Sequence, residues 1–149
     1  MARRYAAVGS DTNTAATTMW TITSATTIRP AIYEILIGSV ATPADNAWEF
    51  ILGRTTAAGT STAFTPNALD DGDPASLAAA GFAHTVEPTY TANASLLRIA
   101  GNQRAAYRWI ASPGGELKMP ATAANGIGCL SNAVGGSAVA MSFTIHWEE

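Results

Sequence analysis

Two glutamates are the candidate catalytic residues of this chain. Glu34 and Glu49 lie in neighbouring segments of predicted strand, and two carboxylates can serve as general acid and general base. Glutamates on sheets more often accept hydrogen bonds from arginine, and Arg29, Arg54 and Arg108 are available for this. The sequence has no nucleophile-elbow motif and no phosphate-binding loop. We therefore expect no catalytic residue, and we expect that the protein is not an enzyme.

The spacing of the ligand-type residues does not favour a metal site. His84 and His146 are far apart, and neither has a second His or Cys at the spacing of a zinc site. Asp70, Asp71 and Asp73 form the cluster DDGD, but the sequence around it does not follow the EF-hand pattern. We expect neither a metal nor a cofactor, and we predict that Asp73 caps a helix instead.

The composition indicates one charge-poor domain. Of the 149 residues, 48% are hydrophobic and only 13% are charged, whereas about a quarter is usual. So little charge favours an assembly component that is covered by partners. The net charge of −3, without a basic stripe, argues against nucleic-acid binding, and no segment has the roughly 20 apolar residues of a membrane span. The N-terminus resembles no secretory signal, so we expect synthesis in a cytoplasm.

The tryptophans allow two interpretations. Trp20, Trp48, Trp109 and Trp147 could form a platform on which sugars stack, or they could fill the core. The core is favoured, because three or four of them fall on the face that the alternation predicts to be inward. Cys129 is the single cysteine, so it can form no internal disulfide, and we expect it to be a small buried side chain.

Alternation of apolar and polar residues predicts about eight strands. The segment 105–119 is the predicted centre: Tyr107 and Trp109 share one face, Ser-Pro-Gly-Gly at 112–115 forms a turn, and 117–119 returns as a hairpin. The strictest alternation runs from Val139 to Glu148. The other predicted strands cover residues 19–23, 30–39, 47–54, 85–92, 95–100 and 126–130.

The segment 68–81 is the predicted helix, with Asp73 as its N-cap, Pro74 at its first position and Gly81 after its last alanine. The fold class expected from these elements is all-β, an antiparallel two-sheet jelly-roll sandwich with one short helix. We expect residues 1–18 to form an N-terminal arm and loop, and residues 19–149 to form the jelly-roll domain.

The segment 31–38 is a candidate subunit contact. Both of its faces carry bulk, which suits a central strand that lies under a second sheet or a neighbouring subunit. The candidate contact residues are Tyr33, Ile35 and Ile37 on one face, opposite Ile32, Glu34 and Leu36.

The N-terminal residues Arg3, Arg4 and Tyr5 form a second candidate contact. Arginine and tyrosine are favoured at interfaces, so this arm could reach a neighbouring protein. The alternative is a disordered terminus.

Two long runs resemble a known class of protein. They are WEFILGRTTAAGTSTAFTPNALDDGDPAS (48–76) and HTVEPTYTANASLLRIAGNQRAAYRWIASPGGELKMPATAANGIG (84–128). These runs, which cover about half of the 149 residues, resemble small virion proteins of tailed bacteriophages, of the capsid decoration (cement) type. The resemblance implies a jelly-roll sandwich that assembles as a homotrimer on the outside of an icosahedral capsid. Its partners would be itself and the major capsid protein, with assembly in the host cytoplasm.

One other function remains open at this point. A glycan- or receptor-binding head of a phage fibre would also be a charge-poor sandwich, and it would expose an aromatic platform. Decoration of the capsid, with Arg3–Arg4–Tyr5 reaching the shell or a neighbour, is the favoured expectation.

Overall fold

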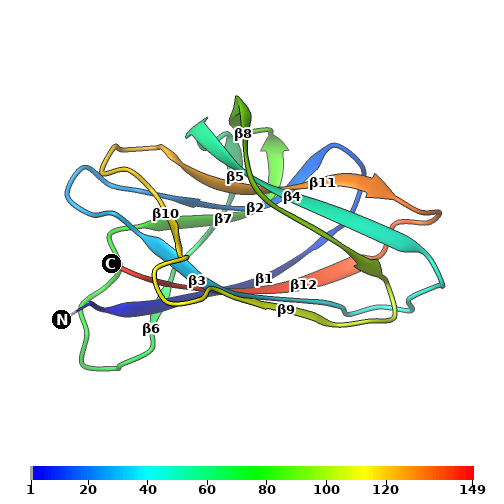
Figure 1. The fold of residues 1–149 in the computed structure, drawn as a ribbon, viewed down its shortest axis with the longest axis horizontal. Helices are drawn as coiled ribbons and strands as arrows, with labels where there is room; N and C mark the ends of the chain where they lie inside the picture. The colour runs from blue at the N-terminus through cyan, green and yellow to red at the C-terminus, as the bar shows by residue number, and fades with distance from the viewer. Residues whose placement is uncertain (1) are drawn as a thin grey trace.

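Two antiparallel β-sheets face each other in the computed structural model, which describes residues 2–149 except for the side chains of 133 and 134. Figure 1 shows them as two layers, with both termini at the same end of the molecule. Sheet A contains β1 (Arg4–Thr12), β3 (Ala31–Ser39), β6 (Asn67–Ala68), β9 (Tyr107–Ile110), β10 (Leu117–Lys118) and β12 (Ala140–Glu148). Sheet B contains β2 (Thr17–Thr23), β4 (Ala47–Ala57), β5 (Thr60–Phe64), β7 (Ala79–Val86), β8 (Thr89–Asn102) and β11 (Gly126–Val134).

The strands pair in a nested order. β1 pairs with β12, β2 with β11, β3 with β9 and β10, and β4 with β8. The first strand therefore lies beside the last, the second beside the last but one, and so on inward along the chain. Successive pairs alternate between the two sheets. The predicted all-β class and the two antiparallel sheets are confirmed.

Residues 58–88 lie between the strands of the innermost pair and close one side of the sandwich. Within them β5 pairs with β7, β7 extends sheet B beside β2, and β6 extends sheet A beside β1. At the corner between the sheets the Phe64 and Phe82 rings pack edge to face, with centroids 5.9 Å apart.

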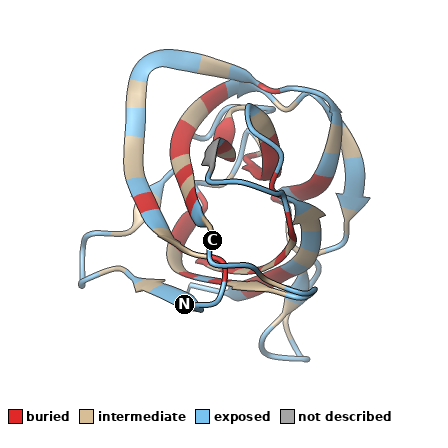
Figure 2. Ribbon diagram, turned by 90° about the vertical axis from the view of Figure 1, so that its right-hand side faces the viewer, coloured by how far each residue is buried: buried red, intermediate tan, exposed pale blue. Residues whose placement is uncertain are grey.

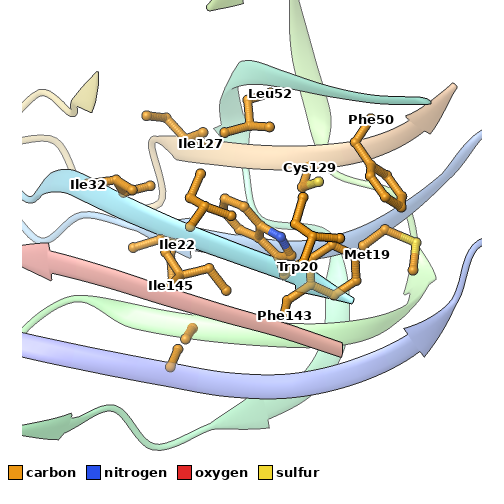
Figure 3. Packing of buried hydrophobic residues seen from close by; sticks show 14 of the residues in the cluster. Met19, Trp20, Ile22, Ile32, Phe50, Leu52, Ile127, Cys129, Phe143 and Ile145 are labelled. Carbon is orange, nitrogen blue, oxygen red and sulfur yellow. The ribbon is translucent and has the colours of Figure 1, made fainter. Parts of the chain in front are cut away.

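The core fills the space between the layers, as the buried positions in Figure 2 show. Side chains from β2, β4 and β11 point toward those of β3 and β12 (Figure 3). Trp20, Trp48 and Trp147 are among the largest buried side chains, so the core interpretation holds for these three; Trp109 is partly buried against the same cluster. Cys129 is buried, as predicted, and burial raises the pKa of its thiol.

The predicted helix over 68–81 is wrong, because residues 2–149 contain no helix and thus none that could cross a bilayer. The Asp73 N–H closes a turn onto the Asp70 carbonyl, and residues 74–78 then lead into β7 without regular structure, bending at 77 and 78. The Leu77 and Ala78 N–H groups, which a helix would bond internally, donate instead to the carboxylate of Glu149. Long-range hydrogen bonds have replaced the local ones.

The predicted hairpin over 105–119 is also wrong in its pairing. Its turn is present, with Gly115 N–H donating to the Ser112 carbonyl at 2.7 Å and Gly114 at a φ of +83°. However, β9 and β10 both pair with β3 and not with each other. Residues 111–116 therefore loop out between two short strands on the same edge of β3.

Residues 4–12 of the predicted N-terminal arm form β1, which pairs along its whole length with β12. Tyr5 is fully buried, its ring stacks on Trp147, and its hydroxyl donates to the Pro74 carbonyl at 3.0 Å. Most of this segment is thus part of the sandwich.

Candidate interaction surface

The outer face of sheet A is a surface that the described chain leaves open. Strand alternation sends one set of side chains into the core and the other set outward. The register of β1, β12, β3 and β9 places Val8, Thr144, Leu36 and Arg108 in one row across this face. The next row contains Ala6, His146, Glu34 and Ile110.

A β-bulge changes which residues of β3 reach this face. The register between β12 and β3 shifts so that Trp147 lies opposite Ile32 and His146 opposite Glu34. Tyr33 is the extra residue, and its ring lies near the outward ring of His146. Ile35 and Ile37 point into the core and are at most 2% exposed. Of the three residues predicted as a subunit contact, only Tyr33 is therefore accessible at this surface.

The outward residues form a continuous chain of contacts across the sheet. The guanidinium of Arg4 lies 5.4 Å from the ring centroid of Tyr33, which lies 6.0 Å from the ring of His146. The His146 Nδ1 is 2.9 Å from Glu34 Oε2, and Arg108 Nε donates to Glu34 Oε1. We call these five residues the polar chain.

Glu34 is the acceptor at the centre of the polar chain. The pKa of the Glu34 carboxyl is lowered from its ordinary 4.5. The hydrogen bond from His146 has the largest effect, and the hydrogen bond from Arg108 is the next largest of the influences that lower the pKa. Partial burial acts in the opposite direction and does not prevail. The carboxylate is therefore charged and internally paired at neutral pH.

Exposed aliphatic side chains surround the polar chain. Val8 is 47% exposed, Leu36 36% and Ile110 55%, and all three lie in the rows defined above. Alternation places Val40, directly after β3, on the same face. Single exposed aliphatics are ordinary, but several on one flat sheet face are typical of an interaction surface.

The outer face of sheet B, in contrast, is covered in part by its own chain. The ring of Tyr90 lies over Gly53 and Gly128, where a Cβ would approach ring carbons to 3.1 Å at Gly53 and the hydroxyl to 2.5 Å at Gly128. The Tyr90 hydroxyl is 2.9 Å from Thr18 Oγ1. Glycine in β4 and β11 thus allows a segment of β8 to fold onto the sheet.

An open hollow of about 770 Å³ adjoins the end of the sheet A face at which both termini lie. Arg3 and Arg4 line it together with Asp70, Asp73 and Glu148, and Arg3 Nε is 3.7 Å from Asp73 Oδ1. The structure therefore places the predicted contact residues Arg3 and Arg4 at this hollow, whereas Tyr5 lies beneath it in the core.

The two glutamates considered for catalysis lie on different sheets. Glu34 is paired with Arg108, one of the arginines named as available, while Glu49 pairs with Arg98 at 3.1 Å and accepts from Asn132. No group of three or more His, Cys, Asp or Glu residues within the described part of the chain is arranged to hold a metal ion.

Two apolar members of the surface, Val8 and Ile110, were not predicted from the sequence. Val8 and Ile110 lie far apart in the sequence, and only the pairing of β1 with β12, of β12 with β3 and of β9 with β3 brings them to one face. The signal in the sequence is the alternation within β1, which places Val8 on the face opposite the buried Ala7.

Comparison with known proteins adds no relative. No protein-family model matches the sequence, and neither a curated protein nor a solved structure matches it.

Proposed function

We propose that the protein is a structural virion component, a capsid decoration (cement) protein that binds the outside of a tailed-phage head and stabilises it. The observation that carries the proposal is the open face of sheet A on a sandwich of low charge. The polar groups that could have done chemistry, Glu34 and Glu49, are bonded within the chain. The resemblance of residues 48–76 and 84–128 to phage virion proteins points in the same direction.

The finer fold that we propose is a jelly roll. Its support is the nested pairing of β1 with β12, β2 with β11, β3 with β9–β10 and β4 with β8, alternating between sheets. In this interpretation residues 58–88 are an insertion between the two innermost strands, and β5, β6 and β7 cover the edges of both sheets there.

The partners in this proposal are further copies of the chain, a homotrimer by the resemblance, and the major capsid protein. The protein would be assembled in the host cytoplasm and would lie on the capsid exterior. Arg3 and Arg4, beside the hollow, are the proposed shell contacts, because arginine suits hydrogen-bonded contact with carboxylates and carbonyls.

A fibre head that binds glycans is the alternative, and it has less support. Such a site would stack sugars on exposed aromatic rings. Trp20, Trp48 and Trp147 lie in the core, and Trp109 is partly buried against it. Specific binding on a glycan array would favour the alternative.

Deletion of the gene from the phage that encodes it tests the proposal. Heads that lack the protein should release DNA at a lower temperature than complete heads, and purified protein added back should restore the tolerance. Equal tolerance of both kinds of head would overturn the clamping role. An Arg3→Gln variant, which leaves Arg4 and the polar chain intact, should bind the heads more weakly, whereas the matched variant Arg98→Gln, on sheet B, should bind as the parent does.

A further inference from the structure

We infer that the open face of sheet A is the surface through which copies of this chain associate. The inference rests on the proposed function and deepens it, since it names the partner of this face as a second copy. The face is formed by the outward residues of β1, β12, β3 and β9, with Val8, Leu36, Ile110 and Tyr33 as its exposed apolar groups.

The size of the face suits an association between proteins. Strands rise about 3.3 Å per residue and lie about 4.8 Å apart, so three nine-residue strands and the four residues of β9 span roughly 500 Å² in projection. Side chains that stand out from the sheet increase the accessible area. A standard interface buries about 800 Å² on each partner, which is the same order of magnitude.

The charge on the face suits a second copy in particular. Arg4 and Arg108 balance Glu34 and Glu148, so the face is neutral when His146 is neutral. The whole chain carries a net charge of −3, which must then reside on the rest of the surface. Copies repel one another least where their neutral faces turn toward a shared three-fold axis, and the alternating signs allow arginine of one copy to approach glutamate of the next.

The central charges of the face can be covered without being left unpaired. Glu34 accepts from both His146 and Arg108 within one chain. Covering a charge that already has its hydrogen-bond partners costs far less than covering an isolated one. Tyr33 and the two arginines are also residue types that are enriched at the centre of interfaces.

The decisive experiment measures the mass of the purified chain by light scattering across concentration. The wild type should have three times the 15.4 kDa mass of one chain. A Val8→Glu/Leu36→Glu variant should run at 15.4 kDa, because two carboxylates would be buried at the contact. The control Leu77→Glu/Val86→Glu changes two exposed aliphatic residues that lie outside the face, and it should keep the mass of the wild type.

Thermal unfolding of each variant shows whether it is folded, and Val8→Ala/Leu36→Ala provides a milder version of the same test. The inference is overturned if the wild type stays at 15.4 kDa up to about 1 mM, or if the face variants associate like the wild type. It is also overturned if the control dissociates as readily. A monomeric wild type that still protects phage heads would overturn this inference alone and leave the proposed function standing.

Discussion

The imidazole Nδ1 of His84 lies 3.1 Å from the carbonyl oxygen of Thr18. The same threonine meets two more residues of one short segment: Glu87 Oε2 accepts from its N–H at 2.9 Å, and the Tyr90 hydroxyl is 2.9 Å from its Oγ1. All three polar groups of Thr18 are therefore occupied by residues 84–90. This arrangement holds the connection between β7 and β8 against the start of β2.

Removing the Tyr90 hydroxyl should weaken this arrangement. Tyr90→Phe keeps the ring over Gly53 and Gly128 but removes the contact with Thr18 Oγ1, a loss of about 1 kcal/mol for a partly buried hydrogen bond. For a chain of this length we expect the melting temperature to fall by about 3 °C. The control Tyr107→Phe alters an exposed tyrosine and should leave the melting temperature unchanged; an equal fall in both variants would contradict the role of Thr18.

The same histidine makes stability depend on pH. Burial lowers the pKa of His84 below its ordinary 6.5, and this effect exceeds the opposing effects of the Thr18 carbonyl, Glu87 and Asp11. The unfolded chain therefore binds a proton at higher pH than the folded chain does. The contribution to stability is fully present above 6.5, begins to be lost as the pH falls below that value, and is lost once the pH has fallen through the lower pKa of the folded state.

Urea unfolding between pH 8 and pH 5 measures this dependence. The free energy of unfolding of the wild type should fall across the range, and His84→Asn, which keeps a donor near the Thr18 carbonyl, should show a flatter dependence. An NMR titration should give His84 a midpoint below 6.5. A midpoint at or above this value would show that burial does not control the ring.

Sequence patterns predicted the strands well where alternation is strict, and failed where distant residues decide. Val139–Glu148 alternates without interruption, and β12 follows it closely. In contrast, β5 (Thr60–Phe64) has the composition of a loop, and it forms a strand because β7 lies beside it. The capping signals at Asp73 and Pro74 were locally sound, but Glu149, far away in sequence, satisfies the backbone donors that follow them.

Of the three contact residues predicted on segment 31–38, only Tyr33 reaches the open face of sheet A. The segment 31–38 does lie across an exposed face, yet strict alternation placed Tyr33 with Ile35 and Ile37. The bulge opposite His146 and Trp147 reverses the direction of Tyr33. A bulge depends on the partner strand, so the sequence of one strand cannot reveal it.

We predict that glycine at position 128 is required for the Tyr90 ring to pack on the outer face of sheet B. A Cβ there would lie 2.5 Å from the Tyr90 hydroxyl oxygen, so Gly128→Ala should displace the ring and lower stability by about 1–3 kcal/mol. Gly38→Ala is the matched control, because the nearest atom to its added Cβ is 4.0 Å away. Chemical denaturation should separate the two; similar losses would mean that contact with Tyr90 is not the cause.

The carboxylate of Glu149 should fix the irregular segment before β7 in place. It accepts hydrogen bonds from the N–H groups of Leu77 and Ala78 and from the Ser76 hydroxyl. Glu149→Ala removes all three, so residues 69–78 should be cleaved faster by a protease in the native state. Glu148→Ala is the control at the neighbouring position. Equal cleavage rates in parent and Glu149→Ala would mean that the Tyr5 hydroxyl bond to Pro74 suffices.

The polar chain on sheet A should contribute to stability in acid. The pKa of Glu34 is lowered in the folded state, first by the hydrogen bond from His146 and then by Arg108. The contribution is present above the ordinary value of 4.5 and is lost as the pH falls through the lower pKa of the folded state. Below about pH 4.5 the free energy of unfolding of Glu34→Gln should therefore depend less on pH than that of the parent. At pH 7 the variant should lose no more than about 1 kcal/mol of stability, because Arg108 is largely exposed.

Two further variants separate the causes. His146→Thr should raise the pKa of Glu34 more than Arg108→Thr does, since the bond from His146 is the larger influence. The carboxyl carbon of Glu34, followed by NMR as the pH is lowered, reports this directly. If Arg108→Thr shifts the titration of Glu34 more than His146→Thr does, the guanidinium has the larger influence on the pKa of Glu34, and the prediction is wrong.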